Sequence, residues 1–188
     1  MSSIMDELTA RLGSDDYVNQ LSGMLGTNKE QTGAAVQSAI PAIVAGLARN
    51  ASTPQGAQAL HTALANDHDG SVLEEGAQAL PANQQQGDKI LGHVFGSNLG
   101  AVQSQLASTT GLGSSGAGSL LQMLAPMVMG YLGKQQNGGG LDAGGLASMV
   151  GGAGAAEMLP GSLGNLLGRG GSGSGGLMSA LGKIFGRR

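Results

Sequence analysis

The run Asp67-His68-Asp69-Gly70-Ser71-Val72 holds residue types that bind a divalent cation. In a calcium-binding loop, carboxylates at positions 3 and 5 supply oxygen ligands, and a glycine at position 6 allows a sharp turn. Asp67, Asp69 and Gly70 match these three positions, and Val72 matches the aliphatic residue at position 8. The run therefore predicts a candidate site for calcium or another metal at Asp67 and Asp69.

The two ends of this run do not fit a calcium loop. Position 1 is Ala65 and position 12 is Gly76, so the first ligand and the bidentate glutamate are missing. We favour a structural interpretation, in which the Asp side chains accept hydrogen bonds from nearby backbone N–H groups. Gly70 then takes a positive φ, and Ser71 caps the following helix. A metal site shared between this run and His93 is a further alternative.

The motifs of common catalytic nucleophiles are missing from the sequence. The chain contains no Cys, which excludes a thiolate nucleophile, a thiolate metal site and a disulfide scaffold. No Ser lies in a G-x-S-x-G turn, and the Gly-rich stretches lack the G-x-x-x-x-G-K-[ST] pattern that holds phosphate. We therefore expect a protein that is not an enzyme and has no cofactor, apart from the calcium considered above.

The C-terminal end carries a candidate interaction segment, residues 177–188. Its apolar residues recur at i, i+4, i+7 and i+8, which places them on one face of a short helix with basic residues nearby. We expect this face to dock on the same chain, on a neighbouring copy or on another protein. Weak contact with a membrane surface and a solvated tail are the alternatives. The segment consists of apolar Leu177, Leu181, Ile184 and Phe185 with basic Lys183, Arg187 and Arg188.

Charge and composition exclude other partners. The formal net charge is −3, and two Phe and two Tyr supply no stacking platform, so we expect no nucleic-acid binding. No run of 18 apolar residues predicts a membrane span, and the acidic start does not resemble a secretory signal. We expect a cytoplasmic location.

Apolar spacing predicts helices throughout the first two thirds of the chain. Short helices are expected before Gly13 and before Gly26, and a long helix over Thr27–Asn50 contains Pro41 and starts with a capping box. Later helices begin at Thr53-Pro54 and Asn98, and a loop is expected over Asn66–Gly70. Ile90, Leu91, Val94 and Phe95 form another short helical face, and a second long helix over about Ser115–Lys134 contains Pro126.

This pattern predicts an internal repeat with an offset of 85 residues. The offset pairs Leu21 with Leu106, Gly26 with Gly111, and Pro41 with Pro126. Each unit, over 3–50 and 88–134, consists of a short helix, a short helix and a long helix that we expect to be kinked at its proline. Small residues on the long helices, including Ala34, are expected to allow close packing.

Glycine content divides the chain. Residues 1–70 hold 7 Gly, whereas residues 138–188 hold 18. Glycine disfavours helices, so we expect an all-α helical core over 1–137, a flexible Gly-rich linker over 138–176 and the short basic amphipathic helix over 177–188.

Four runs show a family resemblance: Ala39–Asn50, Asn66–Ser71, Ile90–Gly96 and Leu124–Lys134. In these runs the chain resembles the bacterial family catalogued as domain of unknown function 937, over about residues 5–135. The resemblance implies a bacterial, mostly helical protein and implies no activity. Together these features predict a non-enzymatic helical module for interaction or assembly that associates with itself. The alternatives are a calcium- or metal-responsive module and a peripheral membrane-surface protein.

Overall fold

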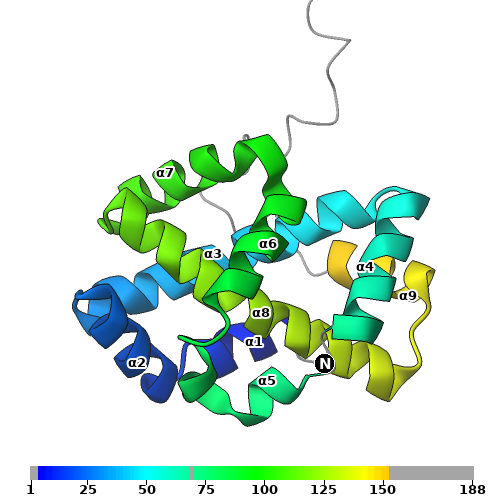
Figure 1. The fold of residues 1–188 in the computed structure, drawn as a ribbon, viewed down its shortest axis with the longest axis horizontal. Helices are drawn as coiled ribbons and strands as arrows, with labels where there is room; N and C mark the ends of the chain where they lie inside the picture. Colours follow the sequence, from blue (N-terminus) through cyan, green and yellow to red (C-terminus); the bar gives the residue numbers. More distant parts are fainter. Residues whose placement is uncertain (1–3, 68–69, 153–188) are drawn as a thin grey trace, which may run out of the picture.

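The chain is all-helical in the computed structural model, which describes residues 4–67 and 70–152 (Figure 1). No β-strand occurs in these residues, so the all-α prediction is confirmed there. Two short 3₁₀ turns, Gly76–Ala79 and Gly96–Asn98, join longer elements. The α-helices are α1 (Ile4–Leu12), α2 (Asp15–Leu25), α3 (Lys29–Ala51), α4 (Pro54–Asp67), α5 (Ser71–Glu74), α6 (Gln84–Phe95), α7 (Leu99–Thr110), α8 (Ser114–Gly139) and α9 (Ala143–Gly151).

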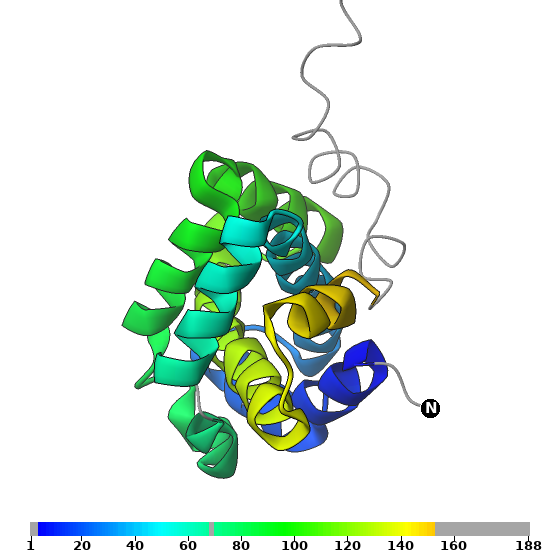
Figure 2. The same ribbon diagram turned by 90° about the vertical axis from the view of Figure 1, so that its right-hand side faces the viewer.

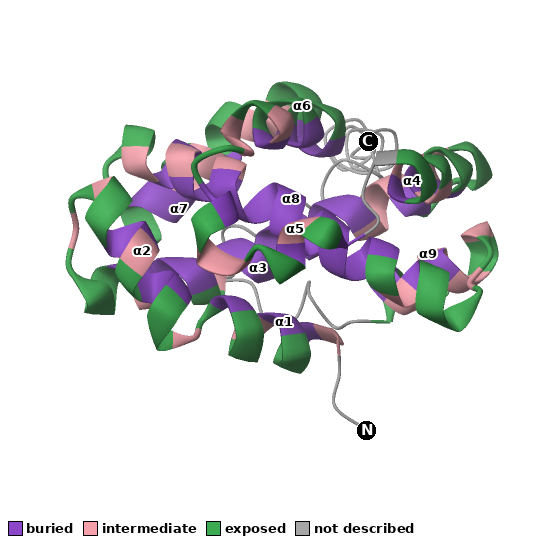
Figure 3. Ribbon diagram, turned by 60° about the horizontal axis from the view of Figure 1, so that its bottom comes forward, coloured by how far each residue is buried: buried purple, intermediate pink, exposed green. Residues whose placement is uncertain are grey.

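The two long helices α3 and α8 form the centre of the domain (Figures 2 and 3). They are apolar on most of their circumference, as expected for helices covered on all sides by others. Their fully buried residues include Ile43 and Leu47 on α3 and Val128 and Leu132 on α8. Both helices continue through a buried proline, Pro41 in α3 and Pro126 in α8. The kinks expected at these prolines stay a prediction.

The surrounding helices are amphipathic and each buries one face on this centre (Figure 3). Most apolar positions expected on the helices before and after α3 are buried, including Leu8 on α1, Leu21 on α2 and Leu64 on α4, whereas Ile4 and Leu25 are partly buried. On α6, the predicted face of Ile90, Leu91, Val94 and Phe95 is buried as well. The 3.6-residue spacing therefore identified the core-facing side of these helices correctly.

Two helix ends match at the expected offset of 85 residues. Gly26 ends α2 and Gly111 ends α7, both in the left-handed conformation, with φ of 65° and 74°. Their N–H groups donate to the carbonyls of Ser22 and Ala107, which are themselves 85 residues apart. The long helices then begin at Lys29 and Ser114, again 85 residues apart. Glycine tolerates this backbone conformation without steric cost, so it ends both helices at the same place.

Several local predictions need correction. The N-cap of α3 is Asn28, whose side chain accepts a 2.8 Å hydrogen bond from the Gln31 N–H, so the capping box expected at Thr27 is wrong. The hydroxyl of Thr27 instead forms a hydrogen bond with the hydroxyl of Thr32. α4 extends to Asp67, into the loop expected over Asn66–Gly70. Ala34, expected to line the packed face of α3, is exposed.

The Gly-rich region begins with ordered structure. α8 runs to Gly139 rather than ending near Lys134, and Gly140 ends it with φ of 58°. The chain then forms α9 within the range 138–176 that we expected to be a linker. Each interior Gly costs a helix about 1 kcal/mol relative to Ala, so α9 depends on contacts with other helices. Residues 153–176 lie outside the described part of the chain.

Gly87 allows a close contact between the backbones of α6 and α8. Gly87 on α6 lies against the backbone of Gln122 on α8, where a Cβ atom would overlap the Gln122 carbonyl group. The side chain of Gln122 also donates a 3.1 Å hydrogen bond to Asp88 Oδ1, so the two helices are joined beside the contact. This contact determines how closely α6 lies on α8.

Candidate interaction surfaces on helix α4

Helix α4 lies between two other surface helices and contributes to two candidate interaction surfaces. On one side it packs against α9, and on the other it faces α6 across a groove. Thr53 positions the start of α4, because its hydroxyl accepts a 3.1 Å hydrogen bond from the Gly56 N–H. The predicted Thr53-Pro54 helix start is therefore confirmed.

The first surface is the α9 seat, defined here as the face of α3 and α4 that α9 covers. α9 is held there by two side chains, Leu146 and Val150, which are 0% and 1% exposed. They are one helical turn apart, so both point to the same side of α9. Ala143, Ala147 and Met149 pack against the core as partly buried neighbours. The α9 seat therefore accepts a short apolar helix through two main anchors.

The turn between α8 and α9 is attached to α4 through His61. The His61 ring Nε2 donates to the carbonyl oxygen of Leu141 at 3.2 Å, and Gln136 Nε2 donates to the carbonyl oxygen of His61 at 3.3 Å. Gln136 is 5% exposed, and its Oε1 has no hydrogen-bond partner among the described residues. A buried carbonyl without a partner costs free energy. The α8–α9 junction therefore combines two long hydrogen bonds with one unpaired acceptor.

The second surface is a groove of about 730 Å³ between α4 and α6. Its apolar side chains come from α3, α4, α6 and α8, and this volume is in the range of sites for small ligands. The apolar lining residues are Leu47, Ala59, Leu60, Ala63, Ile90, Val94 and Met129.

The rim of this groove is polar and carries positive charge. Lys89 and His93 are one turn apart on α6, line the groove and are exposed. Asn50, at the end of α3, donates from Nδ2 to the carbonyls of His93 and Val94 at 3.1 and 3.2 Å. These carbonyls lie in the last turn of α6, where carbonyl groups have no N–H partner within the helix. Asn50 therefore holds the His93 end of α6 beside the start of α4.

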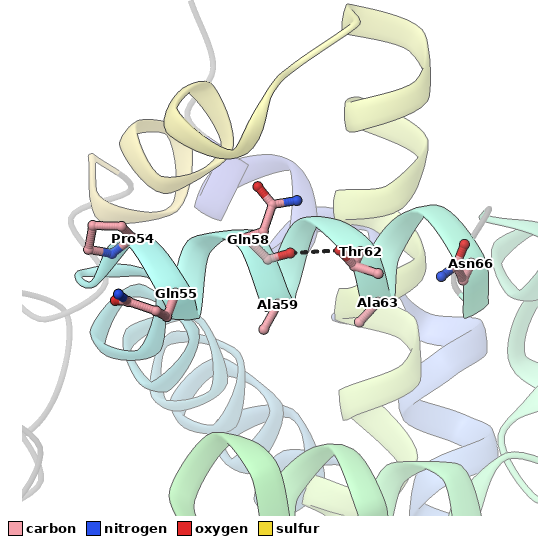
Figure 4. A pocket seen from close by; sticks show the side chains of 7 residues that line it. All are labelled: Pro54, Gln55, Gln58, Ala59, Thr62, Ala63 and Asn66. Carbon is pink, nitrogen blue, oxygen red and sulfur yellow. Dashed lines mark hydrogen bonds between the residues drawn. The ribbon is translucent and has the colours of Figure 1, made fainter.

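The outward surface of α4 carries uncharged polar side chains (Figure 4). Ala59 and Ala63 point toward α6, whereas Gln58 points to the opposite side of the helix (Figure 4). The hydroxyl of Thr62 donates to the carbonyl of Gln58 at 2.9 Å, within the helix itself. The side chains that line this surface therefore include no acid–base group and no activated nucleophile.

A polar cluster joins α1 to α8 away from α4. The hydroxyl of Tyr131 donates to Glu7 Oε2 at 2.6 Å and accepts from Gln135 Nε2 at 2.9 Å. Burial, followed by the hydrogen bond to Glu7, raises the pKa of Tyr131 from 10.0 to about 12. This cluster therefore joins α1 to the central helix α8.

The side chain of Arg11, on α1, donates a 3.1 Å hydrogen bond to the carbonyl of Leu73. Burial also raises the pKa of Tyr17, against the opposing effect of nearby Arg11.

The predicted metal site lies at the edge of the described residues. Asp67 is the last residue of α4, and Asp69 lies outside the described part of the chain. Gly70 has the positive φ expected of it, 95°, but it is itself the N-cap of α5, so the prediction of Ser71 as cap is wrong. His93 lies by the start of α4, whereas Asp67 ends a helix about 20 Å long. The metal assignment of Asp67 and Asp69 stays a prediction.

The predicted interaction segment falls outside residues 4–67 and 70–152. It comprises Leu177, Leu181, Ile184, Phe185, Lys183, Arg187 and Arg188. Within the described ranges, no three His, Asp or Glu residues group closely enough to hold a metal ion. Of the helices in these ranges, none has both the length and the apolar character needed to cross a bilayer.

Comparison with known proteins identifies the family. Residues 6–135 match the family described as "Bacterial protein of unknown function (DUF937)", and the chain belongs to this family. The resemblance found in the four sequence runs is therefore confirmed. No curated protein and no solved structure matches the chain. The match ends within α8, so α9 and everything after it lie beyond the matched region.

Sequence reasoning missed both surfaces of α4. The groove joins Leu47, Leu60, Ile90 and Met129, and no spacing within one helix predicts that they meet. The α9 seat was missed because the glycines around α9 indicated a linker. A signal was present, since Leu146 and Val150 are spaced i, i+4 between glycines and Asp142 is a good N-cap.

Proposed function

We propose that this chain is a non-enzymatic interaction module that assembles with a second copy of itself. In this assembly, the C-terminal segment 177–188 of one copy docks on the helical domain of the other. The observation that carries the proposal is α9, a short apolar helix from beyond the family-matched region that is docked on α3 and α4. The domain therefore accepts a short appended helix through a few apolar anchors.

The distribution of charge supports the same assembly. Residues 1–152 contain eleven Asp and Glu against five Lys and Arg, whereas residues 153–188 contain one Glu and four basic residues. Three of these basic residues lie in the segment itself: Lys183, Arg187 and Arg188. A basic segment is attracted to an acidic domain, and the attraction accelerates association at low salt.

We also infer that the domain is a degenerate duplication of one helical unit. The matched ends of α2 and α7, the matched starts of α3 and α8, and the buried pair Pro41 and Pro126 support this inference. After each long helix the chain forms a helix on the surface, α4 after α3 and α9 after α8. The two surface helices pack against one another.

Light scattering on the full chain over a range of concentrations tests the assembly. We expect a mass above that of the 18.5 kDa monomer that falls on dilution. Changing Leu177 and Leu181 together to Ala removes two anchors and is expected to give a monomer at the same concentrations. Ser179→Ala changes a residue outside the apolar face and is the matched control. A full-length chain that is monomeric at all concentrations would remove the proposal.

The basic rim of the α4–α6 groove favours a second candidate function, the binding of an amphipathic carboxylate. The apolar lining offers a surface for an alkyl chain, while Lys89 and His93 offer positive charge and a hydrogen-bond donor to a carboxylate. The volume of about 730 Å³ suits a chain of medium length.

Calorimetric titration with dodecanoate below its micellar concentration tests this second function. We expect saturable binding that weakens about fivefold in Lys89→Gln, because one charge-assisted contact is lost. Lys29→Gln removes an exposed charge outside the groove and is expected to leave the affinity unchanged. Equal weakening by both substitutions would show a nonspecific charge effect and contradict the groove as the site.

A further inference from the structure

The amino-acid sequence of α9 recurs at the C-terminal end of the chain. Residues 144–151 read Gly-Gly-Leu-Ala-Ser-Met-Val-Gly, and residues 175–182 read Gly-Gly-Leu-Met-Ser-Ala-Leu-Gly. Five of the eight positions are identical, a sixth exchanges Val for Leu, and the other two exchange Ala and Met between them. The two stretches therefore have nearly the same composition and the same order of apolar positions.

The recurrence includes the two anchors that hold α9 in place. Leu146 corresponds to Leu177, and Val150 corresponds to Leu181, each 31 residues later. These are the only α9 residues that are buried, at 0% and 1% exposure. A helix formed by residues 175–182 thus presents two branched apolar side chains one turn apart, as α9 does on α3 and α4. The α9 seat therefore already holds the pattern of apolar side chains that the second stretch carries in its sequence.

We propose that residues 175–182 of one copy bind the α9 seat of a second copy and displace α9 from it. This proposal rests on the self-association proposed above and names the surface at which it occurs. Residues 153–174 separate α9 from the second stretch in the sequence, and a flexible chain of this length would span about 25 Å on average. That span allows the stretch to reach a neighbouring domain.

Three features favour the incoming stretch over α9. Leu181 has one more methylene group than Val150 and buries more apolar surface. Ile184 and Phe185 follow on the same helical face, where α9 ends at Gly151 and Gly152. Lys183, Arg187 and Arg188 add attraction to the acidic domain. α9 has the advantage of being attached next to the seat, so exchange depends on protein concentration.

The structure also shows why α9 can leave. Three of its nine residues are glycine, so it gains little helix stability of its own. Beside its apolar contacts, the polar attachment of the α8–α9 junction to α4 consists of the two long hydrogen bonds at His61, and Gln136 Oε1 there has no partner among the described residues. The turn before it contains Gly140 in the left-handed conformation, a residue that changes backbone direction at low cost.

Paired substitutions in the full chain distinguish this seat from any other. Changing Leu146 and Val150 together to Ala weakens α9 and frees the seat, so we expect the dissociation constant for self-association to fall at least about tenfold. Changing Leu177 and Leu181 to Ala is expected to raise it at least about tenfold. Ser148→Ala and Ser179→Ala, at corresponding positions, are the matched controls.

The outcomes separate the two proposals. If the Leu177/Leu181 variant loses self-association while the Leu146/Val150 variant keeps the original dissociation constant, the segment binds elsewhere and the α9 seat is wrong. If neither variant changes the dissociation constant, the segment does not mediate assembly and the proposed function fails as well.

Hydrogen exchange on the native chain provides a test without substitutions in the domain. A synthetic peptide of residues 174–188 is added to the full protein, and exchange is followed in the amides of residues 146–151. We expect faster exchange in α9 when the peptide binds, because α9 leaves its seat. A peptide with Ala at positions 177 and 181 is expected to have no effect. Unchanged α9 exchange in the presence of bound peptide would overturn the displacement.

Discussion

The hydroxyl of Tyr131 donates a hydrogen bond of 2.6 Å to Oε2 of Glu7, although the two residues are 124 positions apart. Tyr131 lies on the central helix α8 and is 4% exposed, while Glu7 lies on α1 and is exposed. A hydrogen bond to a charged carboxylate is stronger than one between neutral groups. The bond therefore attaches the first helix of the chain to the centre of the domain.

Tyr131→Phe is expected to lower the free energy of unfolding by about 1 kcal/mol, since it removes this bond and keeps the ring. Urea denaturation followed by circular dichroism measures the change. Glu7→Gln retains an acceptor and is expected to cost less than the tyrosine substitution. An equal loss in both variants would show that the charge of Glu7 carries the effect.

Alkaline pH should destabilise the domain through the same tyrosine. Its pKa is raised from 10.0 in the unfolded chain to about 12 in the fold, so the unfolded chain loses its proton first. The stabilisation is complete below pH 10 and is lost as the pH rises toward 12, by up to about 2 kcal/mol. The difference in unfolding free energy between the wild type and Tyr131→Phe isolates this effect. A difference that stays constant from pH 9 to pH 12 contradicts it.

Substitution by Ala at two different glycines of α6 is expected to change the stability of the domain in opposite directions. Gly87→Ala places a Cβ against the Gln122 backbone and is expected to destabilise the domain by about 3 kcal/mol or more. Gly92→Ala adds a methyl group where nothing lies within 4 Å, so we expect stabilisation of about 0.5–1 kcal/mol. Thermal unfolding of both variants measures the contrast. Similar effects of the two substitutions would mean that α6 does not lie against α8 at Gly87.

The His61 contact should control how often α9 opens. His61→Ala removes the 3.2 Å hydrogen bond to Leu141, so we expect amide exchange in α9 to become about fivefold faster. Thr62→Ala changes the next residue, whose hydroxyl bonds only within α4, and is the control. Exchange in α7, on the other side of the domain, is expected to be the same in all three proteins. Slower or unchanged exchange in α9 would remove the role given to His61.

Calcium titration tests the sequence prediction at Asp67 and Asp69. A loop without the first ligand and the bidentate glutamate is expected to bind weakly, with a dissociation constant on the order of 1 mM. Calorimetry on the full chain should then show heat that disappears in the Asp67→Asn, Asp69→Asn double variant. Heat that persists in this variant places the calcium elsewhere, and no heat at about 10 mM calcium ends the metal prediction.

Helix positions were predictable wherever the sequence contains local end signals. Gly13, Gly26 and Gly111 follow their helices directly, and Thr53-Pro54 begins α4, because caps act within a few residues. The start of α3 was misassigned by one residue, since Thr27 and Asn28 are both good caps and only the fold shows that Asn28 bonds the Gln31 N–H. End signals of this kind cannot report which helices pack together.

The surfaces of α4 depend on tertiary contacts and so were not predictable. α9 contains enough glycine to favour disorder in isolation, and the burial of Leu146 and Val150 on α3 and α4 stabilises the helix. The groove likewise exists because α4 and α6 both pack on α8, where the close contact at Gly87 holds α6. Each of these relationships joins residues far apart in sequence.

The small number of aromatic residues limits which parts of the protein intrinsic fluorescence reports on. With no Trp in the sequence, Tyr17 and Tyr131 are the intrinsic fluorophores, and both are buried near α1. Tyrosine emission therefore reports structural changes near α1, whereas movements of α4 and α9 give no signal of this kind. A single tryptophan introduced at Met149, a partly buried position on α9, would give the opposite end of the molecule its own optical reporter.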